Sequence, residues 1–353
     1  MAMDGSVDCS FASDNWSGLC PEALDALVAA NHGSSSPYGT DAWTERARSE
    51  IQRLFDCAAE VFFVTSGTAG NSLSLAHLTR PYHSILCHGL SHILLDECGA
   101  PGFFGQGAGL KAISQTEDAR IELMELKAAL SQPNDLRFQP PSVLSLTQST
   151  ERGTLYSEGD LASLIAAAKE AGLHIHMDGA RLLQAAAATK VSPARISAKV
   201  GVDVLTLGGT KIGGGLADAV VFFNRKLAEG FSHRLKQAGQ VPAKYRMLTA
   251  PWVGLLTADA WTRHAANANA MAADLEATLL KCGYAPYCPR QSNMVFVRFS
   301  DAVTQALHNQ GWQFHFHPKT GVARLVTGWD ASPDRNRRFE QALRKIQNQS
   351  ATE

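Results

Sequence analysis

The chain has 353 residues and a formal net charge of −1, with 45% hydrophobic and 18% charged residues. Its length suggests about two domains, and its composition allows a large buried core. The near-zero charge gives no attraction to nucleic acid or to an anionic membrane surface, so we expect a small-molecule partner or a second copy of the chain.

Seven cysteines occur without any CxxC spacing, which argues against a disulfide framework or a zinc ribbon and favours a reducing compartment. We therefore expect no metal centre. The first residues, MAMDGSVDCSFASDNWSG, contain no basic segment followed by an apolar run, so no signal peptide is predicted. No stretch approaches the roughly 18 apolar residues of a membrane-spanning helix. These features predict a soluble cytoplasmic protein.

Short β-branched or aromatic runs alternate with helical patterns along the first two thirds of the chain. We expect strands at five such runs, which are 60–64, 142–147, 173–178, 203–207 and 218–223. The segment EGDLASLIAAAKEAG, at 158–172, predicts a helix with an acidic first turn and a glycine at its end. Alternation of this kind predicts a mainly parallel α/β sheet with helices on both faces.

The pattern changes near residue 248. An alanine-rich helical stretch spans 255–281, and after it come NMVFVRF, a helix from residue 301, QFHFHP, VARLV and a terminal helix. We therefore predict a large domain over 1–247, with the N-terminal segment contributing to its site. A smaller C-terminal α+β domain is predicted over 248–353.

The first motif with chemical potential is HMDGAR, in which Asp178 ends a predicted strand and is followed by glycine. Ligands of open α/β sheets bind at the carboxyl ends of strands, so a carboxylate here is well placed to bind one. An aspartate that caps the next helix is the structural alternative, and the motif alone leaves both open.

The second motif is LTLGGTKIGGG, at 205–215, where Lys211 follows a predicted buried strand and has five glycines around it. A backbone without side chains on both sides suits an amine that must reach a bulky ligand. A glycine-rich turn with a solvated lysine is the alternative. The chain has no GxxxxGK[ST] motif, and GQGAG at 105–109 is not GxGxxG because Leu110 replaces the third glycine.

The third motif is FFVTSGTAGNSLSL, in which a strand runs into Ser66, Gly67 and Thr68 and then into a helix. Free N–H groups at a helix N-terminus, with two hydroxyls, form an anion site, whereas an ordinary Ser/Thr cap is the alternative. Together, an anion site, an acid at a strand end and a lysine are the groups that pyridoxal 5′-phosphate (PLP) requires. The acid keeps the pyridine nitrogen protonated, and the lysine forms a Schiff base.

With these motifs the chain resembles the threonine aldolases, which belong to the aspartate-aminotransferase-like (fold type I) PLP enzymes. The resemblance covers nearly the whole length and includes SDNW, SPYGTD, TSGTAGN, GLSHILLDECGAP, HMDGAR, the lysine loop, SNMVFVR and ARLVTGWD. It implies retro-aldol cleavage of L-threonine, L-allo-threonine and related β-hydroxy-α-amino acids to glycine and an aldehyde. It also implies a homodimer or homotetramer.

The resemblance implies roles for individual residues, beginning with the cofactor. Lys211, preceded by Thr210, matches the Schiff-base lysine, and Asp178 matches the partner of the pyridinium nitrogen. The cradle of the third motif matches the phosphate loop. His92 matches the histidine that stacks on the cofactor ring, and it is also a candidate base, directly or through a water. Lys236 matches a lysine that reaches the phosphate from a neighbouring subunit.

Three further residues match groups that hold the substrate carboxylate, namely Ser13, Arg181 and Arg324. For Arg181 the resemblance also allows a contact with the phenolic oxygen of the cofactor. Arg324 lies in the strand-like run VARLV, and a bidentate guanidinium is the natural clamp for a planar carboxylate. Its structural alternative is an ion pair on an edge strand.

Two departures from the family pattern bear on stereospecificity and aldehyde preference. Better-known bacterial members have a histidine shortly after the strand aligned with SVLSLT, where Thr150 and Glu151 stand in this chain. Their lysine loop begins with Ser-Lys, whereas this one has Thr210 before Lys211. Neither change affects the PLP chemistry itself.

Two other activities remain as alternatives. One is a PLP-dependent β-eliminating lyase that acts on another amino acid, and the other is a non-catalytic PLP-binding paralogue. The paired histidines of HIH, at 174–176, and of HFH, at 315–317, resemble metal ligands. We interpret them as strand residues because no third ligand cluster accompanies them.

Overall fold

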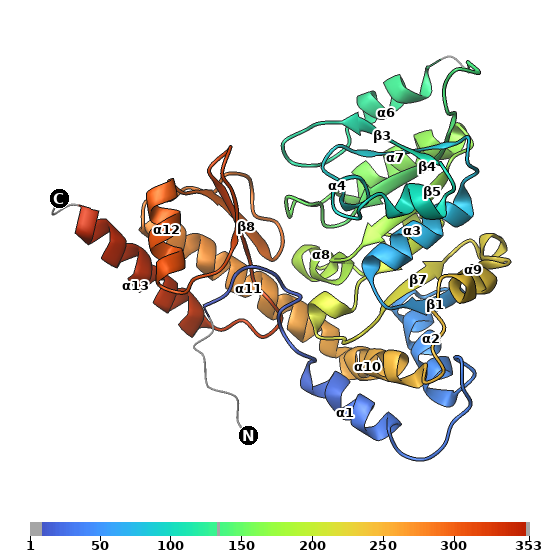
Figure 1. Ribbon diagram of the computed structural model, residues 1–353, viewed down its shortest axis with the longest axis horizontal. Coiled ribbons are helices and arrows are strands. Elements are labelled where there is room, and N and C mark those ends of the chain that lie inside the picture. The colour runs from blue at the N-terminus through green and yellow to red at the C-terminus, as the bar shows by residue number, and fades with distance from the viewer. Residues whose placement is uncertain (1–8, 133–134, 351–353) are drawn as a thin grey trace.

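The computed structural model describes residues 9–132 and 135–350 of the chain. A seven-stranded sheet is flanked by helices, and a three-stranded antiparallel sheet with its own helices lies beside it (Figure 1). The predicted fold class, a mainly parallel α/β sheet with a smaller C-terminal α+β part, is confirmed.

The large sheet has the strand order β1-β7-β6-β5-β4-β2-β3. Its strands are β1 Glu60–Val64, β2 Ser84–His88, β3 Gly109–Ser114, β4 Pro141–Thr147, β5 His174–Gly179, β6 Val204–Leu207 and β7 Asp218–Phe222. The run from β6 to β3 is parallel, whereas β7 is antiparallel to both of its neighbours. The carboxyl ends of β4, β5 and β6 therefore meet at one edge, where open α/β sheets bind ligands.

Both faces of the large sheet are buried, so its strands read as nearly continuous apolar runs. Leu144 and Leu205 belong to one core cluster, while their neighbours Val143 and Val204 belong to another. Successive side chains of a strand point to opposite faces, so the two clusters lie on opposite faces of the sheet.

Ten helices of the described chain surround this sheet. They are α1 Pro21–Ala30, α2 Ala42–Phe55, α3 Gly67–Leu78, α4 His92–Leu95, α5 Ala100–Phe104, α6 Leu123–Leu130, α7 Glu158–Glu170, α8 Leu182–Thr189, α9 Phe231–Gln237 and α10 Arg246–Leu256. Helix α7 begins where the sequence predicts, because Ser157 and Asp160 form a capping box that satisfies its first N–H groups.

The small sheet has the order β8-β10-β9, with β10 in the centre. Its elements are β8 Met294–Arg298, β9 His315–His317, β10 Val322–Val326, α11 Ala260–Lys281, α12 Asp301–Asn309 and α13 Pro333–Ser350. The N-terminal segment joins this part, since the ring of Phe11 stacks on Trp312 at 5.6 Å and meets Phe339 edge-on at 5.1 Å. From there the segment runs to the large sheet.

The helix predicted over 255–281 is interrupted in the structure. Helix α10 ends at Leu256 and packs against α1 and α2, and α11 begins at Ala260. Between them Ala258 and Asp259 have φ values of 50° and 52°, which stop a helix. The packing thus changes at 257–259, while the division at residue 248 stays a prediction. No helix in the described part of the chain is long and apolar enough to cross a membrane.

Candidate active site

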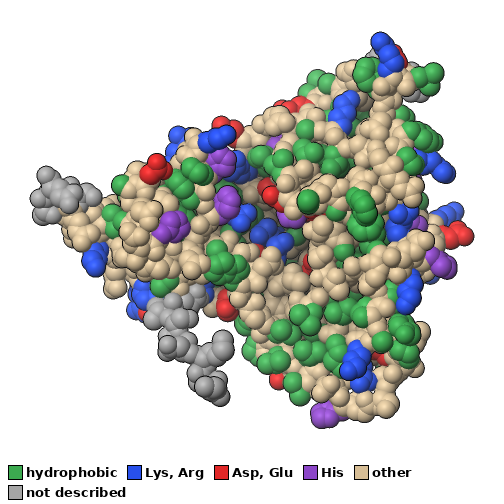
Figure 2. Space-filling view, viewed as in Figure 1, with side chains coloured by type: hydrophobic (Ala, Val, Ile, Leu, Met, Phe, Trp, Pro, Cys, Tyr) green, Lys and Arg blue, Asp and Glu red, His purple; other side chains and the backbone are tan. Residues whose placement is uncertain are grey.

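A cavity of about 650 Å³ lies between the two sheets. The ends of β4, β5 and β6 form one wall, and β8, β9 and β10 form the other. Figure 2 shows basic, acidic and histidine side chains gathered in the hollow between the two parts of the molecule. Six residues predicted from the sequence line this cavity, namely Gly67, His92, Asp178, Arg181, Lys211 and Arg324.

Asp178 is placed at the cavity by β5 and is buried, with 4% of its surface exposed. Asn71 Nδ2 donates to its Oδ2 at 2.8 Å, and the Ala180 N–H donates to its Oδ1 at 2.9 Å. The N-cap of α8 is Arg181, not Asp178. The helix-cap alternative is therefore excluded, and the carboxylate is held rigidly against the cavity.

Lys211 follows β6 in a 3-10 turn, Thr210–Ile212. The turn is fixed by Asp218, whose Oδ1 accepts from the N–H groups of Gly209 at 2.9 Å and Thr210 at 3.2 Å. A side chain at Gly208 would clash with the backbone of Ala180, so the loop can approach β5 only as glycine. The Lys211 amine has no hydrogen-bond or salt-bridge partner within residues 9–132 and 135–350.

The N-terminus of α3 lies at the same cavity through Gly67. Ser66 is the N-cap, and its hydroxyl accepts from the N–H of Ala69 at 3.2 Å. The N–H groups of Gly67 and Thr68, in the first turn, have no acceptor within the helix. The cap and the anion site therefore coexist, with the serine hydroxyl used for the cap and the first N–H groups left for a ligand.

His92 begins α4 and belongs to a chain of buried polar contacts. Its Nδ1 lies 2.9 Å from Glu97 Oε1, and Asn71 Nδ2 donates to that same oxygen at 2.9 Å. The hydrogen bond to Glu97 raises the pKa of His92, burial opposes this shift, and the charge of Asp178 adds to it. Asn71 thus links the contact between His92 and Glu97 to Asp178.

Arg181 is held by a carboxylate that the sequence analysis did not single out. Asp14, fully buried, accepts from Arg181 Nε at 2.8 Å and from its Nη2 at 2.9 Å, and Asn293 Nδ2 donates to it at 3.0 Å. Although burial opposes it, the charge of Arg181 lowers the pKa of Asp14. Ser13 is the neighbour of this carboxylate, but its hydroxyl accepts from the Asn15 N–H at 3.1 Å and does not line the cavity.

Arg324 projects from β10, the central strand of the small sheet, so the edge-strand alternative is wrong. Its Nε is buried without a hydrogen-bond partner, and no carboxylate of the described residues pairs with it. Burial lowers the pKa of this guanidinium, and the charge of Arg181 adds to the shift. A partly buried guanidinium that faces a cavity without a carboxylate partner has its donors available for an anionic ligand.

Lys236 lies on α9, away from the residues that line the cavity. Its ammonium is 4.6 Å from the centre of the Tyr38 ring, which is a cation–π contact. A contact of Lys236 with the cofactor of a second copy stays a prediction.

Glu151 is the cavity residue whose chemical importance the sequence analysis missed. It lies just after β4, and burial raises its pKa to about 7, with hydrogen bonds from backbone N–H groups opposing the shift. The only local signal is its place in the segment where related enzymes carry a histidine.

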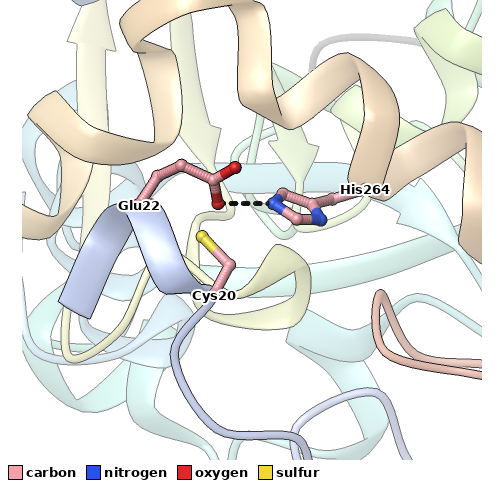
Figure 3. Close-up of side chains that lie close together, drawn as sticks. All are labelled: Cys20, Glu22 and His264. Atoms are coloured by element: carbon pink, nitrogen blue, oxygen red, sulfur yellow. Dashed lines mark hydrogen bonds and ion pairs between the residues drawn. The ribbon is translucent and has the colours of Figure 1, made fainter. Parts of the chain in front are cut away.

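Among the described residues, two groups of side chains have the composition of metal ligands. His92, Glu97 and Asp178 belong to the cavity and are joined by the contacts above. The second group, Cys20, Glu22 and His264, lies between α1 and α11 (Figure 3). There Glu22 already accepts from His264 at 2.9 Å and from Arg263, and burial raises the pKa of the Cys20 thiol to about 11. We interpret this group as a contact that joins α1 to α11.

The paired histidines lie on strands, as predicted. His176 is buried in β5, where its ring nitrogens lie 2.9 Å from Ser145 Oγ and 3.3 Å from Thr206 Oγ1. Burial lowers its pKa to about 4, so it is neutral near pH 7. His315 and His317 lie on β9 and line the cavity.

Comparison with known proteins agrees with this geometry. The family described as "Beta-eliminating lyase" matches residues 10–302. The low specificity L-threonine aldolase of Pseudomonas sp. (strain NCIMB 10558) is 43% identical over 95% of this chain and 97% of its own length, and that of Pseudomonas aeruginosa is 44% identical over the same shares. A threonine aldolase structure from Leishmania major superposes with a TM-score of 0.89 at 27% identity, over 96% of this chain and 99% of its own. The chain therefore belongs to the beta-eliminating lyase family, and its resemblance to the threonine aldolases is confirmed over nearly their full length.

Proposed function

We propose that this chain is a PLP-dependent aldehyde-lyase that cleaves L-threonine, L-allo-threonine and related β-hydroxy-α-amino acids to glycine and an aldehyde. One observation carries the proposal. A single cavity contains an unpartnered lysine, a buried carboxylate and an unpaired guanidinium, which are Lys211, Asp178 and Arg324. The names of its relatives support the choice of reaction among those that PLP enzymes perform.

The cavity wall fits a bound PLP molecule with an amino acid. Buried polar atoms without a hydrogen-bond partner point to groups that a ligand would supply. Among the described residues that line the cavity, these atoms are Asn71 Oδ1, Ser149 Oγ, Glu151 Oε2, Arg152 Nε and Arg324 Nε. Lys211 would hold the cofactor covalently, and Asp178 would bind the pyridine nitrogen. The first turn of α3 would bind the phosphate. When bound, PLP supplies an acceptor for the electrons of a bond broken at Cα.

The residues of this chain position the substrate and the protons. Asp178, whose oxygens are oriented by Asn71 and Ala180, would favour a protonated pyridine nitrogen through its negative charge. Arg324 binds the substrate carboxylate, and a two-pronged contact fixes the rotation that aligns the scissile Cα–Cβ bond. Asp14 orients Arg181 by occupying its Nε and Nη2, which leaves Nη1 for a ligand.

A β-elimination is the second candidate function, and the description of the matching family favours it. It would need a leaving group at Cβ in place of a hydroxyl. A non-catalytic PLP-binding paralogue fits less well, because such a protein has no need of an unpaired arginine beside the lysine and the carboxylate.

A product assay separates these functions. The PLP-loaded protein is given L-threonine and L-allo-threonine, and the products are identified. Glycine with acetaldehyde supports the proposed function, whereas 2-oxobutanoate or pyruvate from a suitable substrate supports elimination. No product from any amino acid, with PLP bound, would support the non-catalytic alternative.

We also propose that the active form is a homodimer or homotetramer, as the resemblance implies. Large apolar side chains of α1 and of the segment after it are exposed, namely Leu24, Val28 and Tyr38. An apolar patch of this kind suits an interface between copies. Sedimentation at assay concentration tests this, because a fully active monomer would contradict it.

A further inference from the structure

We propose that Glu151 is the catalytic base that accepts the β-hydroxyl proton of the substrate when the Cα–Cβ bond breaks. This inference rests on the proposed function. The resemblance gives the role of the base to His92, directly or through a water molecule, and we assign it to Glu151 instead.

The position of Glu151 places its carboxyl among the groups that face the substrate. It follows β4 by four residues and lines the same cavity as Lys211 and Arg324. Asp96 and Asp178 are the other carboxylates of this cavity. Asp178 accepts a hydrogen bond at each of its oxygens and would also bind the cofactor nitrogen, and Asp96 is exposed to solvent. Among the described residues that line this cavity, Glu151 is therefore the buried carboxyl with an oxygen that has no hydrogen-bond partner.

The two oxygens of Glu151 differ in their environment. Oε1 accepts from the backbone N–H of His92 at 2.9 Å and from Thr147 Oγ1 at 3.1 Å, which fixes the orientation of the carboxyl. Oε2 is buried and has no hydrogen-bond partner within the described residues. A buried acceptor without a donor is costly, so we infer that a ligand hydroxyl supplies the donor.

The protonation behaviour of Glu151 suits this role. Burial raises its pKa to about 7, hydrogen bonds to backbone N–H groups and Thr147 oppose the shift, and the charge of Asp178 adds to it. A base with a pKa near the working pH exchanges protons efficiently. The charge of Glu151 interacts with Cys87 on β2, Tyr156 before α7, Asp178 on β5 and Arg181 before α8. The titratable side chains that line the same cavity also include His92, Asp96, Arg152, Lys211, His315, His317 and Arg324.

His92 is less suited to accept the proton. Its Nδ1 is already paired with Glu97, and that contact raises the pKa of the imidazole. A histidine with a raised pKa is protonated over a wider pH range and then has no free lone pair. The His92 side chain is better placed to cover the bound cofactor, while the backbone N–H of His92 orients Glu151.

The proton transfer balances without another reactant. Glu151 Oε2, as a carboxylate, takes the hydroxyl proton, and the O–H electron pair becomes the second bond of the aldehyde carbonyl. The electron pair of the Cα–Cβ bond stays on the glycine fragment, which the cofactor stabilises. Glu151 loses its proton to water after the aldehyde leaves, and Cα gains one proton.

The test compares two reactions of the PLP-loaded protein in Glu151→Gln. The amide keeps an oxygen that accepts from His92 and Thr147 but cannot act as a base. Cleavage of threonine should fall about 100-fold or more, the usual contribution of a general base. Exchange of the glycine Cα proton with D₂O, followed by NMR, should stay within about threefold of wild type, because it involves no β-hydroxyl. Cofactor loading, read by absorbance, should be unchanged.

Two controls make the result specific. Glu170→Gln removes an exposed carboxylate at the end of α7 and should alter neither reaction. A measurement without turnover uses ¹³C NMR of protein labelled at the glutamate carboxyls. One resonance should titrate near pH 7, and it should be missing in Glu151→Gln but present in Glu170→Gln.

Three outcomes decide the matter. Wild-type cleavage in Glu151→Gln would overturn the assignment. A parallel loss of cleavage, glycine exchange and cofactor loading would also overturn it, because Glu151 would then only orient α4. If the PLP-loaded wild type exchanges glycine protons but cleaves no β-hydroxy-α-amino acid, the proposed function itself fails, and this assignment fails with it.

Discussion

The two walls of the cavity differ in the charged groups that they present to a ligand. On the large-sheet wall, Asp178 is buried, and its two oxygens accept hydrogen bonds from Asn71 and from the Ala180 backbone N–H. On the small-sheet wall, Arg324 is partly buried, and its buried Nε has no hydrogen-bond partner among the described residues. Paired groups are already in place before any ligand binds, whereas an unpaired cation is completed by one. We therefore propose that the large-sheet wall binds the cofactor and that the small-sheet wall binds the substrate carboxylate.

The largest effect is expected at the centre of the large-sheet wall. Lys211→Ala should abolish covalent attachment of PLP and all cleavage, because no other lysine lines the cavity in the described chain. The measurement is reduction with borohydride followed by mass spectrometry. A mutant that still carries the cofactor covalently would show that Lys211 is a solvated turn residue.

Asp178→Asn should retain PLP and lose most turnover, by about tenfold or more, where each tenfold corresponds to ~1.4 kcal/mol of barrier. The reason is that an amide does not hold a proton on the pyridine nitrogen. Steady-state kinetics and cofactor absorbance measure the two properties separately. Activity within about twofold of wild type would contradict the role of Asp178 as a cofactor ligand.

On the small-sheet wall, Arg324→Ala should lower kcat/KM by roughly tenfold to a hundredfold or more while cofactor loading stays intact. The lost charge-assisted contact contributes ~1.5–3 kcal/mol. Arg324→Lys should recover little, because an ammonium cannot make the two-pronged contact. If kcat falls along with the rise in KM, Arg324 also aligns the scissile bond.

Loss of the ion pair between Asp14 and Arg181, which joins the two walls, should lower the stability of the fold more than the rate of catalysis. Asp14→Asn leaves Arg181 buried without its carboxylate and should lower the free energy of unfolding by about 3 kcal/mol, which denaturant titration measures. The pKa of Asp14 is lowered in the folded protein, so its contribution is present above the unfolded pKa of ~3.9. The contribution is lost as pH falls through the folded pKa, and the mutant should lack this acid-dependent loss.

Five of the seven strands of the large sheet, and the presence of Lys211 and Asp178 at one cavity, were predictable from the sequence, whereas strands β2 and β3 were not predicted. The predicted limits of β1 and β10 coincide with the structure, because both are short apolar runs with clear ends. Asp178 could be singled out because it lies at the end of a strand, and Lys211 because it lies in the glycine-rich loop after one. These signals are local, and the carboxyl ends of parallel strands then bring the residues together.

Features that depend on distant contacts were not predictable in this way. Asp14 pairs with Arg181 across 167 residues, and no local pattern indicates such a partner. The unpaired state of Glu151 Oε2 likewise depends on how the turn after β4 meets α4. The break between α10 and α11 occurs at Ala258, a residue type that favours helices, so only the three-dimensional packing reveals it.

The most direct test of the division between the walls is a binding measurement. Glycine is titrated into the PLP-loaded wild type and into PLP-loaded Arg324→Ala, with the cofactor absorbance as the readout. We expect equal cofactor loading and spectra before glycine is added, and an apparent Kd for glycine that is at least about tenfold higher in the mutant, equivalent to ~1.4 kcal/mol. An unchanged Kd for glycine, or a mutant that fails to bind PLP, would contradict the assignment of Arg324 to the substrate.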